Sequence, residues 1–370
     1  MTSNQTAIIQ DKTAAMLAYL IQLEDTTGEF TFQTDVGLVD DKSWNSWNWP
    51  QGVALYGLAK MYQQTHDEHL LAIIKDWFHT NLKWPVPERE LNVNGMIPVL
   101  TLATLRDDFQ TEVADLDAYL QSWADWALNT LNKTPFGGFE HDTFGSINRH
   151  QLWDDTLVMA VLPLAKIGVV LKRPDYIAAA MHQFYVHSKF LMERTKGLWY
   201  HGYNFDIGAS FSPVFWGRGN AWISIFIPEF LEIAGDHLNY YEQDYLKQTL
   251  RYQLKALVPL QTSSGLWRTV LDDPSAYPET SATAGFLYGF IAAQRMHLLD
   301  DIEGDGTQQV ITRATAGLLA QIDAEGHVAN VSSGTPVGQD AQFYKAIAIT
   351  DMPYGQALAI LTLAQLHSSL

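Results

Sequence analysis

The sequence predicts an all-α protein, an (α/α)6 barrel in which six inner helices are surrounded by six outer helices. Three observations support this prediction. Apolar residues recur at helical spacing along most of the chain. The helices alternate between amphipathic and almost wholly apolar, and the connecting loops alternate between short and long. Together these features favour one continuous domain over residues 1–370, although a chain of 370 residues would by length alone suggest two.

Twelve helices are expected, and their character follows their order. The odd-numbered ones are amphipathic, as in the fifth, where Val113, Leu116, Leu120 and Trp123 are spaced by three or four residues. The even-numbered ones are apolar nearly all round, which is typical of helices enclosed by protein. The expected helices cover residues 4–22, 51–64, 67–81, 94–106, 110–132, 154–169, 174–194, 217–235, 239–258, 279–299, 306–322 and 354–367.

The loops place the long connections on one face of this barrel. Links from even to odd helices are short, whereas links from odd to even helices are long, and several of the long links repeat a Gly followed by an aromatic residue or His. All six inner helices then begin on the long-loop face. Their N-termini direct free N–H groups and positive dipole ends at one cavity, which favours an anionic ligand there.

Composition narrows the functional classes. The net charge of −18 argues against nucleic acid or an anionic membrane as a partner. No run of 18 apolar residues occurs, and residues 1–6 lack the features of a signal peptide. Cysteine is absent, which excludes disulfides, thiolate metal sites and a cysteine nucleophile. We therefore expect a cytoplasmic protein with no membrane partner; the sequence leaves its oligomeric state open.

The most informative stretch is residues 151–157, where two adjacent carboxylates precede an apolar run. A carboxylate there either caps the helix or carries out acid–base chemistry at a cavity wall. Adjacent helical residues point about 100° apart, so both cannot face the cavity equally. We expect Asp155 to be the catalytic acid, with burial raising its pKa, and Asp154 either to cap the helix or to support Asp155 in the catalytic pair.

Other candidates lie at the starts of the inner helices and in the long loops. Arg218 stands between two glycines and is expected to fork onto a ligand carboxylate, the alternative being a structural ion pair to Glu279 or an Asp. For His201 the spacing leaves a loop role and a site role equally open, and the case for His141 is weaker. Glu279 is expected to complement the helix dipole, with a second-acid role as the minority alternative. The residues expected to bind substrate are Trp44, Trp47, Asn48, Asn94, His141, His201, Arg218, Asn220, Trp222 and Lys345.

Signals for bound groups are missing. The chain has no phosphate-binding loop, no GxGxxG fingerprint and no HExxH, and its histidines lack a convincing metal-ligand spacing. No serine stands in a nucleophile elbow. We therefore expect neither a metal nor an organic cofactor.

Several segments, in order over nearly the whole chain, carry a family resemblance. They are residues 49–57 (WPQGVALYG), 92–98 (NVNGMIP), 137–139 (GGF), 153–157 (WDDTL), 197–201 (GLWYH), 216–222 (WGRGNAW), 279–282 (ETSA) and 354–356 (YGQ). Through them the chain resembles glycoside hydrolase family 105, the unsaturated rhamnogalacturonyl hydrolases, and more distantly the unsaturated glucuronyl hydrolases of family 88. The resemblance implies the barrel, no metal, and release of a Δ4,5-unsaturated uronic acid from the non-reducing end of a lyase-generated oligosaccharide.

The resemblance also implies roles for individual residues. In the family an Asp protonates the C4=C5 vinyl ether and then helps water to add at C5, unlike the carboxylate pair of most glycosidases. That role falls on Asp155, and His201, Arg218 and Trp222 take the positions around the uronate. The glucuronyl branch has a second Asp where this chain offers Asn92 and Asn94, which favours small anionic oligosaccharides from pectin as substrates. The alternatives are glycosaminoglycan fragments, a sugar epimerase or lyase, and a non-catalytic carbohydrate-binding protein.

Overall fold

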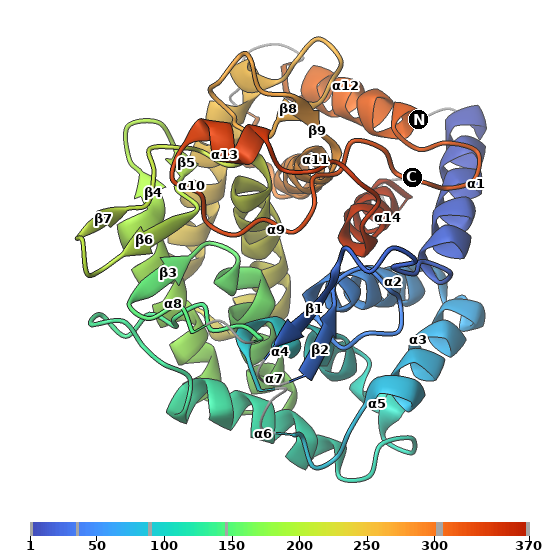
Figure 1. Ribbon diagram of the computed structural model, residues 1–370, viewed down its shortest axis with the longest axis vertical. Coiled ribbons are helices and arrows are strands. Elements are labelled where there is room, and N and C mark those ends of the chain that lie inside the picture. The colour runs from blue at the N-terminus through green and yellow to red at the C-terminus, as the bar shows by residue number, and fades with distance from the viewer. Residues whose placement is uncertain (1–2, 35–36, 88–90, 145–146, 301–305, 368–370) are drawn as a thin grey trace.

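A closed ring of six inner helices forms the centre of the computed structural model, which describes residues 3–34, 37–87, 91–144, 147–300 and 306–367. Each inner helix contacts the next along the chain, and the last contacts the first, so the ring closes (Figure 1). The predicted (α/α)6 barrel is confirmed. The inner helices are α2 (Trp49–Thr65), α4 (Val93–Thr104), α7 (Leu162–Val170), α9 (Gly217–Ala234), α11 (Thr280–Arg295) and α14 (Pro353–His367).

The outer helices cover this ring from outside. In the described part of the chain α1 packs on α14, α3 on α2, α6 and α8 on α7, α10 on α9 and α12 on α11. The expected alternation of inner and outer helices is therefore present. The outer helices are α1 (Ser3–Leu20), α3 (Glu68–Asn81), α6 (Leu116–Asn129), α8 (Pro174–Leu191), α10 (Tyr240–Leu257) and α12 (Gly306–Ala320).

Two expected helices begin later than their apolar pattern suggests. The one expected over 110–132 starts at Leu116, because Asp115 has a left-handed backbone (φ 52°) that separates it from the short α5 (Arg106–Phe109). The one expected from 154 starts as a π-helical turn, η2 (Leu157–Val161), in which the Leu162 N–H donates to the Leu157 carbonyl five residues earlier. Such turns are frequent at functional sites. The short α13 (Ala341–Lys345) was not expected from the sequence.

Short strands organise the long loops, and none was expected from the sequence. One pairing matters for the site: in the β3–β6 ladder Trp153 lies opposite Gly202, and the Asp154 N–H donates to the His201 carbonyl at 3.0 Å. The pairs are β1 (Thr31–Thr34) with β2 (Gly37–Asp40), β3 (Gln151–Trp153) with β6 (Gly202–Asn204), β6 with β7 (Ala209–Ser210), β4 (Met192–Glu193) with β5 (Leu198–Trp199), and β8 (Trp267–Arg268) with β9 (Pro278–Glu279). Single 3₁₀ turns, η3 (Gly235–His237) and η4 (Val258–Leu260), end α9 and α10.

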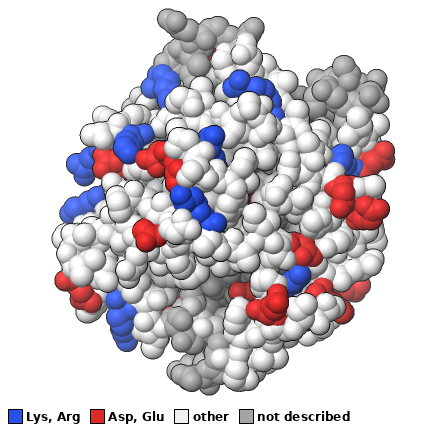
Figure 2. All heavy atoms as spheres, turned by 45° about the horizontal axis from the view of Figure 1, so that its top comes forward, with Lys and Arg blue, Asp and Glu red and all other residues white. Residues whose placement is uncertain are grey.

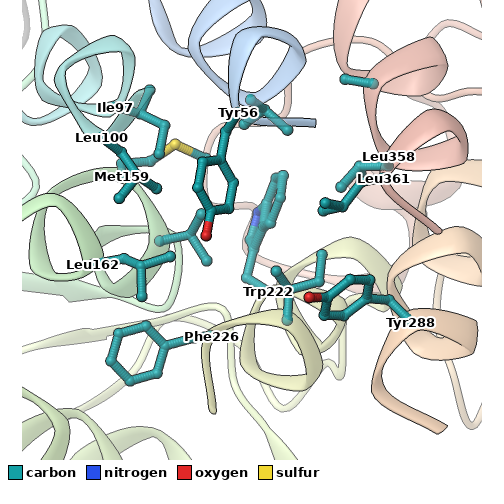
Figure 3. Close-up of a cluster of buried hydrophobic side chains, with 14 of the residues drawn as sticks. Tyr56, Ile97, Leu100, Met159, Leu162, Trp222, Phe226, Tyr288, Leu358 and Leu361 are labelled. Carbon is teal, nitrogen blue, oxygen red and sulfur yellow. The ribbon is translucent and has the colours of Figure 1, made fainter. Parts of the chain in front are cut away.

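Side chains from all six inner helices meet inside the ring, so its centre is packed with protein rather than open (Figure 3). This explains why the inner helices are apolar on every side. The labelled side chains of that cluster are Tyr56, Ile97, Leu100, Met159, Leu162, Trp222, Phe226, Tyr288, Leu358 and Leu361. No helix of the described residues is both long and apolar enough to cross a membrane.

A buried polar clasp joins three inner helices away from the long loops. Glu229, twelve residues into α9, is fully buried and accepts hydrogen bonds from the hydroxyl groups of Tyr56 on α2 and Tyr288 on α11. Lys60 Nζ lies 3.4 Å from the Glu229 carboxylate and also pairs with the more exposed Glu232. Burial raises the pKa of Glu229, although the charge of Lys60 opposes the shift. Within this clasp, Glu229 is the buried carboxylate that lies beside the charge of the buried Lys60.

Candidate active site

A cavity of about 840 Å³ opens at the long-loop end of the barrel. Its wall includes the β1–β2 hairpin, the starts of several inner helices and the loop over 333–336. In Figure 1 the hairpin lies over α2 and α4, in front of the ring. Four of the residues expected near the starts of inner helices, Asn48, Asn94, Asp155 and Arg218, line this cavity.

Asp155 is held in the cavity wall by two ring N–H groups. Trp222 Nε1 donates to its Oδ1 at 3.0 Å, and His201 Nε2 lies 3.1 Å from its Oδ2. Behind the histidine, Nδ1 lies 2.9 Å from the Tyr344 hydroxyl, which in turn accepts the Gly338 N–H. Burial lowers the pKa of His201, so the neutral ring accepts at Nδ1 from Tyr344 and donates at Nε2 to Asp155. The N–H groups of Trp222 and His201 therefore both donate to Asp155, which favours its ionised form.

Asp154 has the opposite environment. Its side chain is fully buried, and neither oxygen has a hydrogen-bond partner among the described residues apart from neighbouring Asp155. The carboxyl group lies against the backbone of Gly219, where an added Cβ would come within 2.3 Å of its Oδ2. Burial, and then the negative charge of Asp155, raise the pKa of Asp154 well above its usual range. Asp154 does not cap the helix, since no N–H group of η2 or α7 donates to it.

The expected pKa direction for Asp155 is therefore corrected. Burial does raise the pKa of Asp155, but the hydrogen bond from His201, and then the positive charges that His201 and His141 carry when acid protonates them, lower it by more. When two carboxyl groups lie this close, ionisation of one disfavours ionisation of the other. The pair holds its proton on Asp154 in the ligand-free protein, while only Asp155 reaches the cavity.

His141 forms part of the wall beside Asp155. Its ring stacks on Trp153 with centroids 4.6 Å apart and an interplanar angle of 11°, and its Nδ1 lies 2.9 Å from the Thr156 hydroxyl. Burial lowers the pKa of His141 to about 4, so the ring is neutral above that pH. It contributes a polar edge and a flat face to the cavity rather than a charge.

Arg218 is the one Lys or Arg residue among the described residues that line the cavity. Its expected fork is already occupied by the protein: Nη1 donates to the Ser332 carbonyl and hydroxyl at 3.0 and 2.6 Å, and Nη2 donates to the Ser333 carbonyl and the Thr335 hydroxyl at 3.0 and 2.9 Å. Glu279 lies 3.9 Å away. Its buried Nε has no hydrogen-bond partner among the described residues. Arg218 therefore anchors the loop at 332–335 and gives the cavity a positive charge.

Four predicted binding residues lie elsewhere. Trp44 and Trp47 are in the hydrophobic core, where Trp47 Nε1 donates to the Gly95 carbonyl, so they form no stacking wall. Asn220 is buried and bonds the backbone of residues 199 and 216. Lys345 pairs with Asp273 at 2.8 Å. None of these four residues lines the cavity, because core packing, hydrogen bonds to the backbone and an ion pair set the directions of their side chains.

His201 and Trp222 also lie behind the wall rather than in it. Both are buried and do not line the cavity, and each forms a hydrogen bond to Asp155, which does. Conversely, sequence reasoning missed the contributions of Asp41, Trp153 and the β1–β2 hairpin. The alternating pattern of residues 30–33 (FTFQ) and the Gly at 37 were the available signals for that hairpin. The cavity-lining residues that had not been predicted include Glu29, Phe30, Phe32, Asp41, Phe144, Trp153 and Ser333 to Pro336.

One cluster has the geometry of a cation site. Ligand atoms of Asp154, Asp155 and His201 all lie within 4.8 Å of one another. His201 Nε2 and both oxygens of Asp155 already have hydrogen-bond partners, and Asp154 is enclosed by protein. The arrangement fits two carboxyl groups that share a proton.

Comparisons with known proteins place the chain in a family. The model of Glycosyl Hydrolase Family 88 matches residues 23–370. The "Unsaturated rhamnogalacturonyl hydrolase YesR" of Bacillus subtilis (strain 168) is 32% identical over 325 residues, covering 86% of this chain and 89% of that protein. A possible member of the GH105 family from Salmonella enterica is 42% identical with a TM-score of 0.91, covering 100% of this chain and 95% of that one. Another from Klebsiella pneumoniae is 40% identical with a TM-score of 0.90, covering 100% and 94%.

Proposed function

The chain belongs to Glycosyl Hydrolase Family 88 and is a carbohydrate-processing hydrolase, and we propose that it releases a Δ4,5-unsaturated galacturonic acid from lyase-generated pectin oligosaccharides such as unsaturated rhamnogalacturonan disaccharide. The observation that carries this proposal is the carboxyl pair, in which Asp155 faces the cavity and Asp154 is buried behind it. A buried Asp154 is out of reach as a nucleophile, so the pair does not suit the double displacement of retaining glycosidases.

The proposed reaction uses the pair as one acid–base unit. The proton held by the pair passes through Asp155 to C4 of the substrate, and positive charge develops at C5 beside the ring oxygen. Water then adds at C5 and gives its proton back to Asp155, which restores the pair. The product is a hemiketal that opens and releases the aglycone, so one water is consumed per bond broken. Asn48, Asn94, His141 and Arg218 are the proposed substrate-binding residues, with Asn94 in place of a second Asp favouring pectin fragments.

An ultraviolet assay tests the substrate class. The conjugated C4=C5 bond absorbs, and its hydration removes the absorbance. We expect purified protein to bleach unsaturated rhamnogalacturonan disaccharide faster than an unsaturated glycosaminoglycan disaccharide. Absorbance that stays constant with the first substrate contradicts the proposed function, and a preference for the second selects the glucuronyl alternative.

Asp154→Asn is expected to lower kcat about tenfold or more near pH 7 and to leave KM unchanged. Without the buried proton, the lowered pKa of Asp155 leaves it deprotonated over a wider pH range, and each pH unit above that pKa costs about tenfold in the acid form. The basic limb of the kcat profile therefore moves to lower pH. A pH–rate series on both proteins measures this shift.

Glu140→Gln is the matched control for that series. Glu140 is also a buried carboxyl with a raised pKa, caused first by burial, but it does not touch Asp155. Its replacement should leave the shape of the pH profile as it is. If Asp154→Asn also leaves the profile unchanged, Asp154 has only a structural role.

We expect dialysis against EDTA to leave turnover within about twofold of the untreated protein. The proposed chemistry uses protons only, and the carboxyl pair with His201 is accounted for by hydrogen bonds and a shared proton. The same assay with added Mg²⁺, Ca²⁺ or Zn²⁺ serves as the control. A loss of activity that one of these ions restores would assign the cluster to a metal instead.

The same proposal extends to the ligand class, the domain organisation and the cellular location of the protein. On the face shown in Figure 2, Lys and Arg lie in small separate groups with Asp and Glu among them, unlike the continuous basic surface that nucleic acids require. Together with the net charge of −18, this supports a small oligosaccharide as the ligand. We propose one domain over residues 1–370, supported by the core that runs through all six inner helices, and a cytoplasmic location, which cell fractionation tests.

A further inference from the structure

A third carboxyl group, Asp41, lines the same cavity and has no part in the proposed reaction. It follows directly after β2, where its N–H donates to the Phe30 carbonyl at 3.0 Å and fixes the base of the hairpin. Its Oδ1 accepts a hydrogen bond from Asn48 Nδ2. Its Oδ2 points toward Gly334, where an added Cβ would lie 3.6 Å away. The carboxyl group therefore lies between the hairpin and the loop that Arg218 anchors.

The surroundings of Asp41 provide no positive partner. Among the described residues no Lys, Arg or His lies within salt-bridge distance of it, and only the Asn48 amide donates to its side chain. Asp41 is half-buried, and a partly desolvated carboxyl group with one neutral donor favours its protonated form. Burial, and then the charge of Asp40, raise the pKa of Asp41 to about 7. The protonated form carries an O–H donor, and no hydrogen bond from the described residues occupies Oδ2.

The groups around Asp41 come from several elements. Asp40 lies beside it on β2, Tyr354 faces it from α14, and Arg218 lies beyond the Tyr354 ring, with its Cζ 4.7 Å from the ring centroid. Lys42 is engaged with Asp351 at 2.8 Å. The other acidic residues among the described residues of the cavity wall are Glu29 and Asp155. Arg218 thus binds the loop at Ser333 and Thr335, and the Asp41 carboxyl group lies beside Gly334 of the same loop.

We propose that Asp41 is a substrate-binding residue that donates its carboxyl O–H to the carboxylate of the sugar acid, next to Gly334 and the positive charge of Arg218. The inference rests on the proposed function, because it requires a uronate as ligand. A carboxyl–carboxylate hydrogen bond is charge-assisted and therefore strong. An ionised Asp41 in the same place repels the ligand, so Asp41 makes uronate binding depend on its own proton.

The sign of the pH dependence follows from this linkage. A bound carboxylate stabilises the protonated form of Asp41 and raises its pKa further, so binding takes up a proton at pH values above about 7. Affinity is constant below that pH and falls above it, by up to about tenfold for each pH unit. The pKa of His141, about 4, lies below this window.

Isothermal titration calorimetry tests the inference. The probe is unsaturated rhamnogalacturonan disaccharide, and an Asp155→Asn background prevents turnover. Titrations at pH 8 in two buffers of different ionisation enthalpy count the protons taken up. We expect uptake approaching one proton per ligand with Asp41 present and a clearly smaller uptake in Asp41→Asn. Because an Asn amide donates without titrating, Asp41→Asn should bind more tightly than the parent at pH 8 and show little pH dependence.

Controls separate this inference from the proposed function. Glu29→Gln removes an exposed carboxyl of the same cavity and should leave proton uptake unchanged. Binding with equal proton uptake in the parent and in Asp41→Asn overturns the role of Asp41 but leaves the proposed function intact. If the disaccharide does not bind at all, both are overturned. If Asp41→Asn in an otherwise wild-type chain loses kcat while binding is unchanged, Asp41 acts in the chemistry and not in recognition.

Discussion

Asp155→Asn is expected to lower kcat by at least about 10³-fold while ligand binding survives. One positioned acid or base contributes roughly 10²- to 10⁴-fold, and Asp155 is proposed to act as both. The substitution preserves shape: the Asn Oδ1 still accepts the Trp222 N–H, and a change of His201 tautomer lets Nε2 accept from the new amide. Ultraviolet turnover and calorimetric binding of unsaturated rhamnogalacturonan disaccharide measure the two effects separately.

Asp142→Asn is the matched control for this substitution. Asp142 lies in the loop next to His141 but does not line the cavity; its oxygens accept from Asn132 and from the Asn148 N–H, which an Asn side chain can partly replace. Its turnover should stay within a few-fold of wild type. If Asp155→Asn also stays within tenfold, Asp155 is not the acid. A wild-type protein that binds the disaccharide without consuming it supports the carbohydrate-binding alternative.

Glu229→Ala is expected to lower the free energy of unfolding by about 3–5 kcal/mol, because it leaves Lys60 with a charge inside the barrel and removes the acceptor of Tyr56 and Tyr288. Urea denaturation followed by tryptophan fluorescence measures the loss. Activity of the remaining folded protein should be unchanged at low temperature, since Glu229 does not line the cavity.

Glu232→Gln tests whether burial is the cause of that loss. Its side chain is 60% exposed, yet it pairs with the same lysine. An exposed ion pair contributes about 0–1 kcal/mol, so this variant should be close to wild type. Equal losses for the two variants would show that the charge of Lys60, and not its burial beside Glu229, determines the stability.

Much of the barrel was determined by the sequence, because helix character is a local property. Apolar residues on every side of a segment predict an enclosed helix whatever its neighbours are, and short and long loops then assign the ends of the helices to two faces. These patterns assign Asn48, Asn94, Asp155 and Arg218 to the long-loop face, and all four line the cavity there. The reaction was predicted from the family motifs, because helix and loop patterns carry no information about chemistry.

The tertiary structure decided which groups contact one another and where the protons are. Asp155 meets Trp222 across 67 residues of sequence, and His201 meets Tyr344 across 143, so no local pattern predicts these bonds. Burial and partners set a pKa, and they give two adjacent aspartates opposite shifts. Contacts between segments far apart in the sequence also decide the places of other residues. They turn Trp44 and Trp47 into the core, direct the Arg218 guanidinium at the loop over 332–335, and bring Asp41 into the cavity wall.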